Sequence, residues 1–128
     1  MQESSFVEKD WECSGLRCVV LANVGGMGYR CGYVAVLPGH PLYEKGYSEL
    51  TNVGVPDELI SVHGGVTFSE DKLYTDNEAL NLEGMWWFGY DCMHGGDSPF
   101  IQDLDYCVAE CESMASQLSA LDKDGDVE

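Results

Sequence analysis

Apolar residues recur at steps of three and four positions near the C-terminal end of the chain, between polar and acidic residues. The repeating positions are Leu104, Cys107, Val108, Cys111, Met114, Ala115, Leu118 and Leu121. This spacing places one apolar stripe along an α-helix, because a helix completes a turn in about 3.6 residues. The pattern predicts an amphipathic helix that begins near Asp103 and a frayed acidic tail over residues 122–128.

Three other runs are dense in apolar, β-branched and aromatic residues, which is typical of β-strands. The first two cover residues 17–24 and 29–37, and the glycine-rich residues 25–28 separate them. We expect these two runs to form a β-hairpin. The third run, residues 84–91, is aromatic enough to be a central strand of a sheet.

The remaining segments carry weaker patterns. Residues 1–15 predict a loosely attached, weakly helical or irregular segment whose Trp11 packs against the body of the protein. Residues 38–56 predict a long loop with a short helix, residues 62–68 predict a β-rich segment that contains a double glycine, and residues 71–83 predict a polar excursion. Together these elements indicate one α+β domain over residues 1–128, with a small antiparallel sheet and a C-terminal amphipathic helix packed on one face.

The net charge of the chain limits the classes of molecule that we expect it to bind. The chain carries 23 acidic and 6 basic residues, a formal net charge of −17, and its basic residues form no cluster. A phosphate backbone would be repelled, so we expect no direct binding of nucleic acid. The same charge suits either solubility alone or a basic protein partner, whose nucleic-acid groove the acidic surface would block.

Cysteine usage and the apolar runs bear on the compartment. The six cysteines are Cys13, Cys18, Cys31, Cys92, Cys107 and Cys111. No apolar run is long enough to span a membrane, and the first residues lack the basic start and apolar core of a secretory signal. We therefore expect a cytoplasmic protein with reduced thiols and no membrane contact.

A zinc site is one interpretation of the sulfur-bearing residues. Cys92, His94, Cys107 and Cys111 are of the types that zinc prefers. Cysteines one helical turn apart on a buried face, however, more often act as small packing residues. We therefore predict no metal and no cofactor.

Two histidines stand directly before paired glycines at predicted strand edges, in residues 62–65 and 94–97. The residues concerned are His63, Gly64, Gly65, His94 and Asp97. Paired glycines let backbone amides approach a ligand closely, while histidine and aspartate provide oriented donors and acceptors. If the two loops meet in space, they form a polar pocket.

Strand alternation adds an aromatic element to this hypothesis. Trp86, Phe88 and Tyr90 share one face of the aromatic strand, because side chains alternate along a strand, and we assign that face to the core beneath the helix. Trp87 and Asp91 then lie on the opposite face. There Trp87 would be a stacking platform for a flat ring.

The motifs HGGVTFS at residues 63–69 and WWFGYDCMHGGD at residues 86–97, with the closing helix that bears cysteines, resemble small proteins encoded in phage and prophage genomes. The resemblance covers roughly residues 17–121. That family has no assigned activity. Small phage proteins with a preformed pocket include inhibitors of host defence, some of which sequester nucleotide signals while others block nucleases by acidic mimicry. The resemblance thus implies a counter-defence role in the host cytoplasm.

The leading functional hypothesis is a noncatalytic protein that binds a nucleotide-like small molecule. Its expected ligand-binding residues are His63, Gly64, Gly65, Trp87, Asp91, His94 and Asp97. Trp87 would stack on a ring, glycine amides would contact polar oxygens, and histidine and aspartate would set the orientation. Two alternatives stay open: an acidic inhibitor of a basic nucleic-acid-binding protein, and a small hydrolase that uses the same histidines and aspartates. A homodimer is compatible with each.

Overall fold

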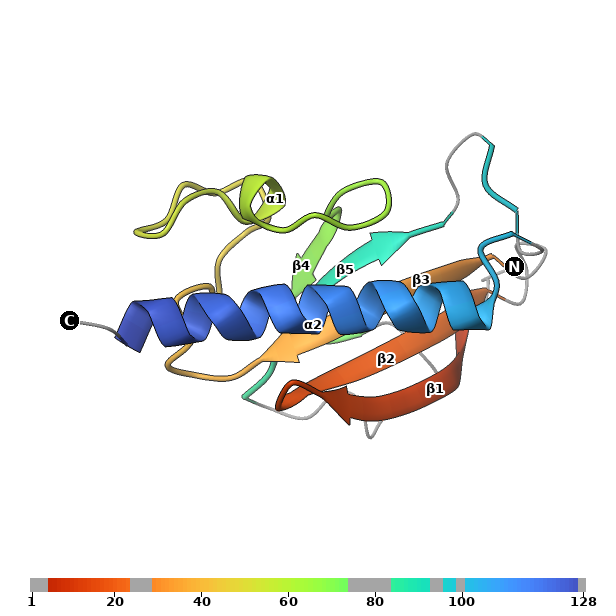
Figure 1. The fold of residues 1–128 in the computed structure, drawn as a ribbon, viewed down its shortest axis with the longest axis horizontal. Coiled ribbons are helices and arrows are strands. Elements are labelled where there is room, and N and C mark those ends of the chain that lie inside the picture. Colours follow the sequence, from red (N-terminus) through yellow and green to blue (C-terminus); the bar gives the residue numbers. More distant parts are fainter. Residues whose placement is uncertain (1–4, 24–28, 74–83, 93–95, 99–100, 127–128) are drawn as a thin grey trace.

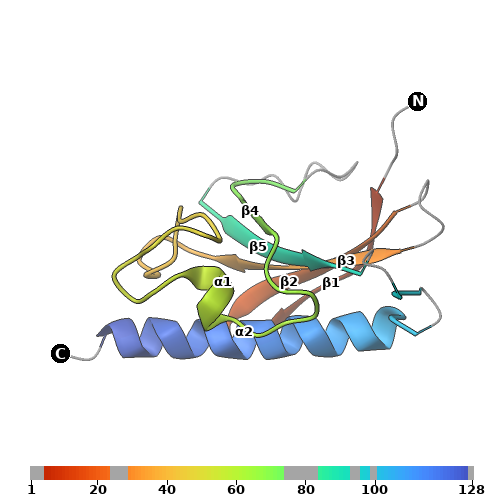
Figure 2. The same cartoon turned by 90° about the horizontal axis from the view of Figure 1, so that it is seen from above.

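A computed structural model describes residues 5–23, 29–73, 84–92, 96–98 and 101–126. Within these residues one antiparallel sheet has the strand order β1-β2-β3-β5-β4. The elements are β1 (Ser5–Cys13), β2 (Leu16–Asn23), β3 (Arg30–Val36), α1 (Pro56–Leu59), β4 (Phe68–Glu70), β5 (Trp86–Asp91) and α2 (Leu104–Asp126). The long helix α2 lies along one face of the sheet (Figures 1 and 2), which confirms the predicted α+β class.

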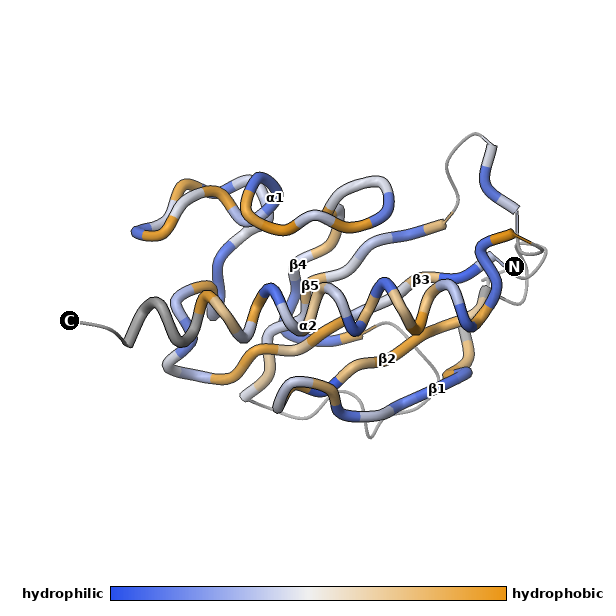
Figure 3. The backbone as a smooth tube through the Cα atoms, in the orientation of Figure 1, coloured by the Kyte–Doolittle hydropathy of each residue, from blue (hydrophilic) through white to orange (hydrophobic). Residues whose placement is uncertain are grey.

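The predicted hairpin is present as β2 and β3, but it is extended by a strand that the sequence did not indicate. Residues 5–13 form β1, which pairs with β2 along its length, so the prediction of a helical or irregular segment was wrong. Ser14 and Gly15 form the turn between them, with φ of 55° and 79°, as a two-residue turn with two left-handed positions requires. Figure 3 shows why the strand was missed: β2 is hydrophobic, whereas β1 is largely hydrophilic.

The main core lies between the sheet and α2. Buried side chains from β2, β3 and β5 meet the apolar stripe of the helix, and Phe88, Tyr90 and the partly buried Trp86 are among them. The assignment of these three aromatic residues to the helix-facing side is therefore confirmed. Asp103 begins the helix as predicted, because its carboxylate accepts the backbone N–H of Tyr106 at 2.9 Å. The helix continues to Asp126, beyond the point where fraying was expected.

The opposite face of the sheet carries a second, smaller core. Its buried members are Val19, Leu21, Ala35, Leu73 and Trp87. Trp87 is 0% exposed, so both faces of β5 are covered at this position. Among the described residues no helix is long and apolar enough to cross a membrane.

Candidate functional site

His63 and Asp97, two of the residues predicted to bind ligand, are in direct contact. The Nε2 atom of His63 lies 3.0 Å from each carboxylate oxygen of Asp97, and its Nδ1 atom lies 2.7 Å from the hydroxyl of Tyr106 on α2. Asp97 comes from the loop after β5, so the structure brings together part of the two His-Gly-Gly motifs. His94 lies outside the described residues.

The same helix holds the backbone next to His63. Glu110 accepts the backbone N–H of His63 at 2.7 Å. The side-chain amide of Gln117 accepts from the backbone N–H of Ser61 at 2.7 Å and donates to its carbonyl at 2.8 Å. Three side chains of α2, those of Tyr106, Glu110 and Gln117, thus fasten residues 61–63 to the helix.

This arrangement assigns a proton to Nε2 of His63. A carboxylate only accepts hydrogen bonds, so Nε2 donates to Asp97, while Nδ1 lies within hydrogen-bond distance of the Tyr106 hydroxyl. Partial desolvation, aided by the charge of Glu110, raises the pKa of Tyr106 above its usual value. The hydroxyl is therefore held in its protonated form, which suits a donor to His63 better than a nucleophile.

The paired glycines of the first motif form a turn. Gly64 and Gly65 have φ of 70° and 84°, where a side chain would be strained. The N–H of Gly65 is donated to the carbonyl of Val62 at 2.9 Å. Because that amide already has a partner, it does not offer the free donor that the sequence hypothesis assigned to it.

Trp87 and Asp91 do not join the His63 cluster. Trp87 is buried in the second core, so its ring offers no stacking surface. The prediction that Trp87 forms a stacking platform was therefore wrong. Its Nε1 atom is the one buried side-chain donor in the described residues without a hydrogen-bond partner. Asp91 accepts a hydrogen bond of 3.3 Å from the hydroxyl of Thr67, on the strand face away from the helix.

His40, in the predicted long loop over residues 38–56, is buried and has a structural role. Its Nδ1 accepts the backbone N–H of Leu42 at 3.0 Å, and its Nε2 lies 2.8 Å from the carbonyl of Leu118. The ring therefore joins the loop after β3 to the last part of α2.

The cysteines are free thiols, as expected. Cys107 and Cys111 are buried on α2, and the sulfur of Cys107 lies 3.7 Å from that of Cys92. A hydrogen bond to Cys107, together with burial, raises the pKa of Cys92, while the same bond lowers the pKa of Cys107 as its acceptor. No group of three or more histidine, cysteine or acidic residues is placed to hold a metal ion in the described parts of the chain.

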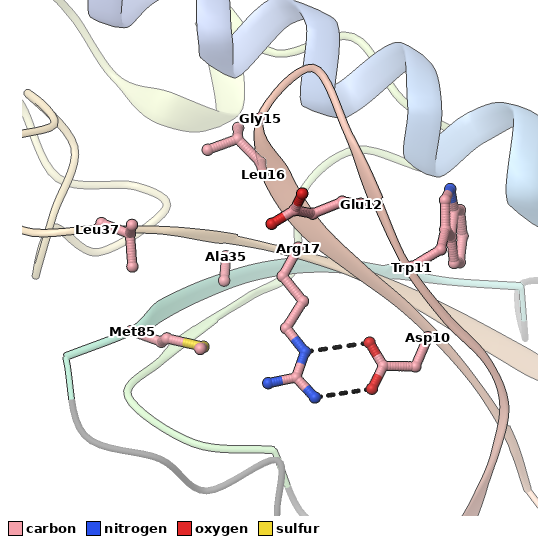
Figure 4. A pocket seen from close by; sticks show the side chains of 9 residues that line it. All are labelled: Asp10, Trp11, Glu12, Gly15, Leu16, Arg17, Ala35, Leu37 and Met85. Carbon is pink, nitrogen blue, oxygen red and sulfur yellow. Dashed lines mark hydrogen bonds and ion pairs between the residues drawn. The ribbon is translucent and has the colours of Figure 1, made fainter.

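A pocket of about 370 Å³ opens on the sheet face opposite α2, beside the turn of the β1–β2 hairpin. We call it the hairpin pocket (Figure 4). Its lining residues are Asp10, Trp11, Glu12, Gly15, Leu16, Arg17, Ala35, Leu37 and Met85. None of them was among the predicted ligand-binding residues, although β1 and β2 supply most of them.

One ion pair organises the polar part of the hairpin pocket. Arg17 donates from Nε and Nη2 to the two carboxylate oxygens of Asp10, at 3.0 Å and 2.7 Å. The hydrogen bond to Asp10 raises the pKa of Arg17, although burial acts against it. Figure 4 shows the Nη1 end of the guanidinium directed away from Asp10, toward the side of the pocket where Met85 lies.

Sequence reasoning missed this pocket because it depends on β1. The turn signal Ser14-Gly15 places Cys13 opposite Leu16 and Glu12 opposite Arg17, and that register alone puts Asp10, Glu12 and Arg17 on one face. If residues 5–13 had been predicted to form a strand, the alternation of side chains would have placed Asp10 and Glu12 on the same face as Arg17. Comparisons with protein-family models, with curated proteins and with solved structures gave no match to this chain.

Proposed function

We propose that this protein binds a small molecule in the hairpin pocket. The observation that carries the proposal is a concavity of about 370 Å³ with both apolar walls and charged groups. Small-molecule sites in proteins are typically clefts of this order of size, mostly apolar, with a few polar groups that set orientation. A role in counter-defence would be one use of such binding.

The frame of the pocket supports a preformed site. Much of its lining lies on paired strands. Leu16 pairs with Cys13 at the start of β2, and Ala35 on β3 pairs with Arg17 on β2. The bidentate Asp10–Arg17 pair holds both side chains in one geometry. Groups held by strands lose little conformational entropy when a ligand arrives, which favours affinity.

The His63 cluster supports binding less well. Both ring nitrogens of His63 already have partners on the protein, and the amide of Gly65 is used in its turn. A ligand there would have to replace hydrogen bonds that fasten the loop to α2. The hydrolase alternative meets the same difficulty, because it needs a nitrogen of His63 for acid and base chemistry.

Thermal unfolding in the presence of a panel of nucleosides, nucleotides, amines and carboxylates tests the proposal. A ligand at a hundred times its Kd adds about 2.7 kcal/mol to the free energy of unfolding, which raises Tm by on the order of 10 °C for a domain of this size. The shift is expected to disappear in Leu37→Trp. Leu37 lines the pocket and is 53% exposed, so a larger ring there blocks the pocket without entering the core.

Leu50→Trp is the matched control, because Leu50 is 78% exposed and does not line the pocket. This variant is expected to keep the full shift. If a ligand stabilises the wild type and Leu37→Trp equally, it binds elsewhere and the proposed site is wrong.

A further inference from the structure

We infer that the ligand of the hairpin pocket is an amphipathic cation, an ammonium or guanidinium group on an apolar stem. The inference rests on the proposed function and names the chemical class that the pocket selects. It departs from the nucleotide-like ligand that the sequence suggested, because the charges that line the pocket favour a positive group.

The charges in the pocket leave one carboxylate without a counterion. Asp10 and Arg17 neutralise each other through two hydrogen bonds. Glu12 is the remaining charged residue of the lining, and within the described residues it makes no hydrogen bond or ion pair. Arg17 is its cross-strand neighbour in register, yet the guanidinium turns to Asp10 instead. Among the described lining residues the net charge is therefore −1, from two carboxylates and one guanidinium.

A carboxylate at the edge of an apolar surface is the partner that an ammonium group on a hydrocarbon stem requires. Leu16, Leu37, Ala35 and Met85 supply that surface in the pocket. Figure 4 shows Glu12 near Gly15 and Leu16, on the hairpin side, with Leu37, Ala35 and Met85 across from it. A stem can contact these side chains while its charged end remains beside Glu12 and close to water.

The field of the whole protein acts in the same direction. A net charge of −17 draws cations toward the surface and repels phosphates and carboxylates. Among the described lining residues the cation is Arg17, and it is already paired with Asp10. An anionic ligand in the pocket would meet Glu12 directly, at a cost in free energy that no second cation among these lining residues offsets.

Matched probes of one length separate charge from hydrophobic contact. We would titrate the 15N-labelled protein with n-hexylammonium, n-hexanol and n-hexanoate in phosphate buffer at low salt, and follow the backbone amides of Gly15, Leu16, Arg17 and Ala35. Hexylammonium is expected to bind roughly three- to tenfold more tightly than hexanol, the range for a partly solvated charged pair. Hexanoate is expected to bind most weakly.

Glu12→Gln should reduce the preference for hexylammonium over hexanol to about one, while hexanol binding stays the same. Glu58→Gln is the matched control, since Glu58 is an exposed acid on α1 outside the pocket and its loss changes the net charge equally. That variant should keep the preference. If both variants lose it to the same extent, general attraction by the acidic protein explains the binding and the inference is overturned.

The cation has two possible sources, which a fourth probe distinguishes. Nα-acetyl-lysine amide presents the ammonium as a side chain of a basic protein would. Binding of this probe as well as hexylammonium identifies a basic side chain, and binding of hexylammonium alone identifies a free amine; either result upholds the inference. Equal binding of hexanol and hexylammonium overturns it but leaves the pocket as a binding site. Absence of any pocket response, here and in the thermal panel, overturns the proposed function as well.

Discussion

The chemical character of several side chains here is set by burial more than by residue type. Cys31 is a clear case, because burial raises its pKa from 9.0 to about 11. Burial likewise raises the pKa of Cys18 to about 12. Thiolates are the reactive form of cysteine, so a raised pKa makes a thiol less reactive at any given pH. These cysteines therefore act as small apolar groups in the folded protein.

Alkylation of Cys31 tests this effect at the residue scale. At pH 8 a pKa of about 11 leaves about 100-fold less thiolate than a pKa of 9.0 does. Iodoacetamide should therefore modify Cys31 about 100-fold more slowly in the folded protein than in urea, as measured by peptide mass mapping. Similar rates in both states would show that its thiol is not desolvated.

Packing between neighbouring strands explains two glycines inside the sheet. Gly32 on β3 lies opposite Tyr90, and Gly89 on β5 lies opposite Tyr33. A Cβ atom at either glycine would come within 2.4 Å of the facing tyrosine ring. Each ring thus lies over a glycine of the adjacent strand, one on each face of the sheet. The hydroxyl of Tyr90 donates to the carbonyl of Cys107 on α2 at 2.9 Å.

Alanine substitution tests this arrangement at the scale of the element. Gly32→Ala should lower the free energy of unfolding by about 1–3 kcal/mol, because Tyr90 must leave its position over the strand. Gly46→Ala is the control, since its Cβ would meet other atoms only at 3.7 Å, and it should change stability by less than about 0.5 kcal/mol. Urea unfolding measures both variants. If both substitutions changed the free energy of unfolding equally, the position of the Tyr90 ring would not depend on the space that Gly32 leaves.

At the scale of the whole molecule, the buried thiols and phenols make stability depend on alkaline pH. Burial raises the pKa values of Cys18, Cys31, Tyr33 and Tyr90 in the folded state. These acids stay protonated in the folded protein while the unfolded chain ionises them. Their contribution is fully present below the unfolded pKa and is lost as pH rises toward the folded value.

The urea midpoint is therefore expected to remain constant from pH 7 to about 8.5 and to fall between the thiol pKa of 9.0 in the unfolded chain and the value of about 11 for folded Cys31. A double variant, Cys18→Ala with Cys31→Ser, should show a shallower fall over the same range. A midpoint that does not change with pH in the wild type would contradict the buried, protonated state of these groups.

Local patterns were sufficient wherever an element carries its own signal. The apolar stripe of α2 and the hydrophobic runs of β2, β3 and β5 each show the periodicity of their structure, so the class of fold and the faces of Trp86, Phe88 and Tyr90 followed from sequence alone. What these features share is dependence on residues that are near in the chain.

The sheet edge and the pockets were decided by tertiary structure. The strand β1 is polar and obtains its hydrogen bonds from β2, so its own sequence gives little sign of it. Trp87 is buried because residues such as Leu73 cover its face of the sheet, which alternation along β5 cannot reveal. The contact of His63 with Asp97 and Tyr106 joins residues 34 and 43 positions apart. Such contacts depend on how distant segments of the chain pack against α2. They could not be predicted from local sequence, because burial and hydrogen-bond partners are properties of the packed molecule.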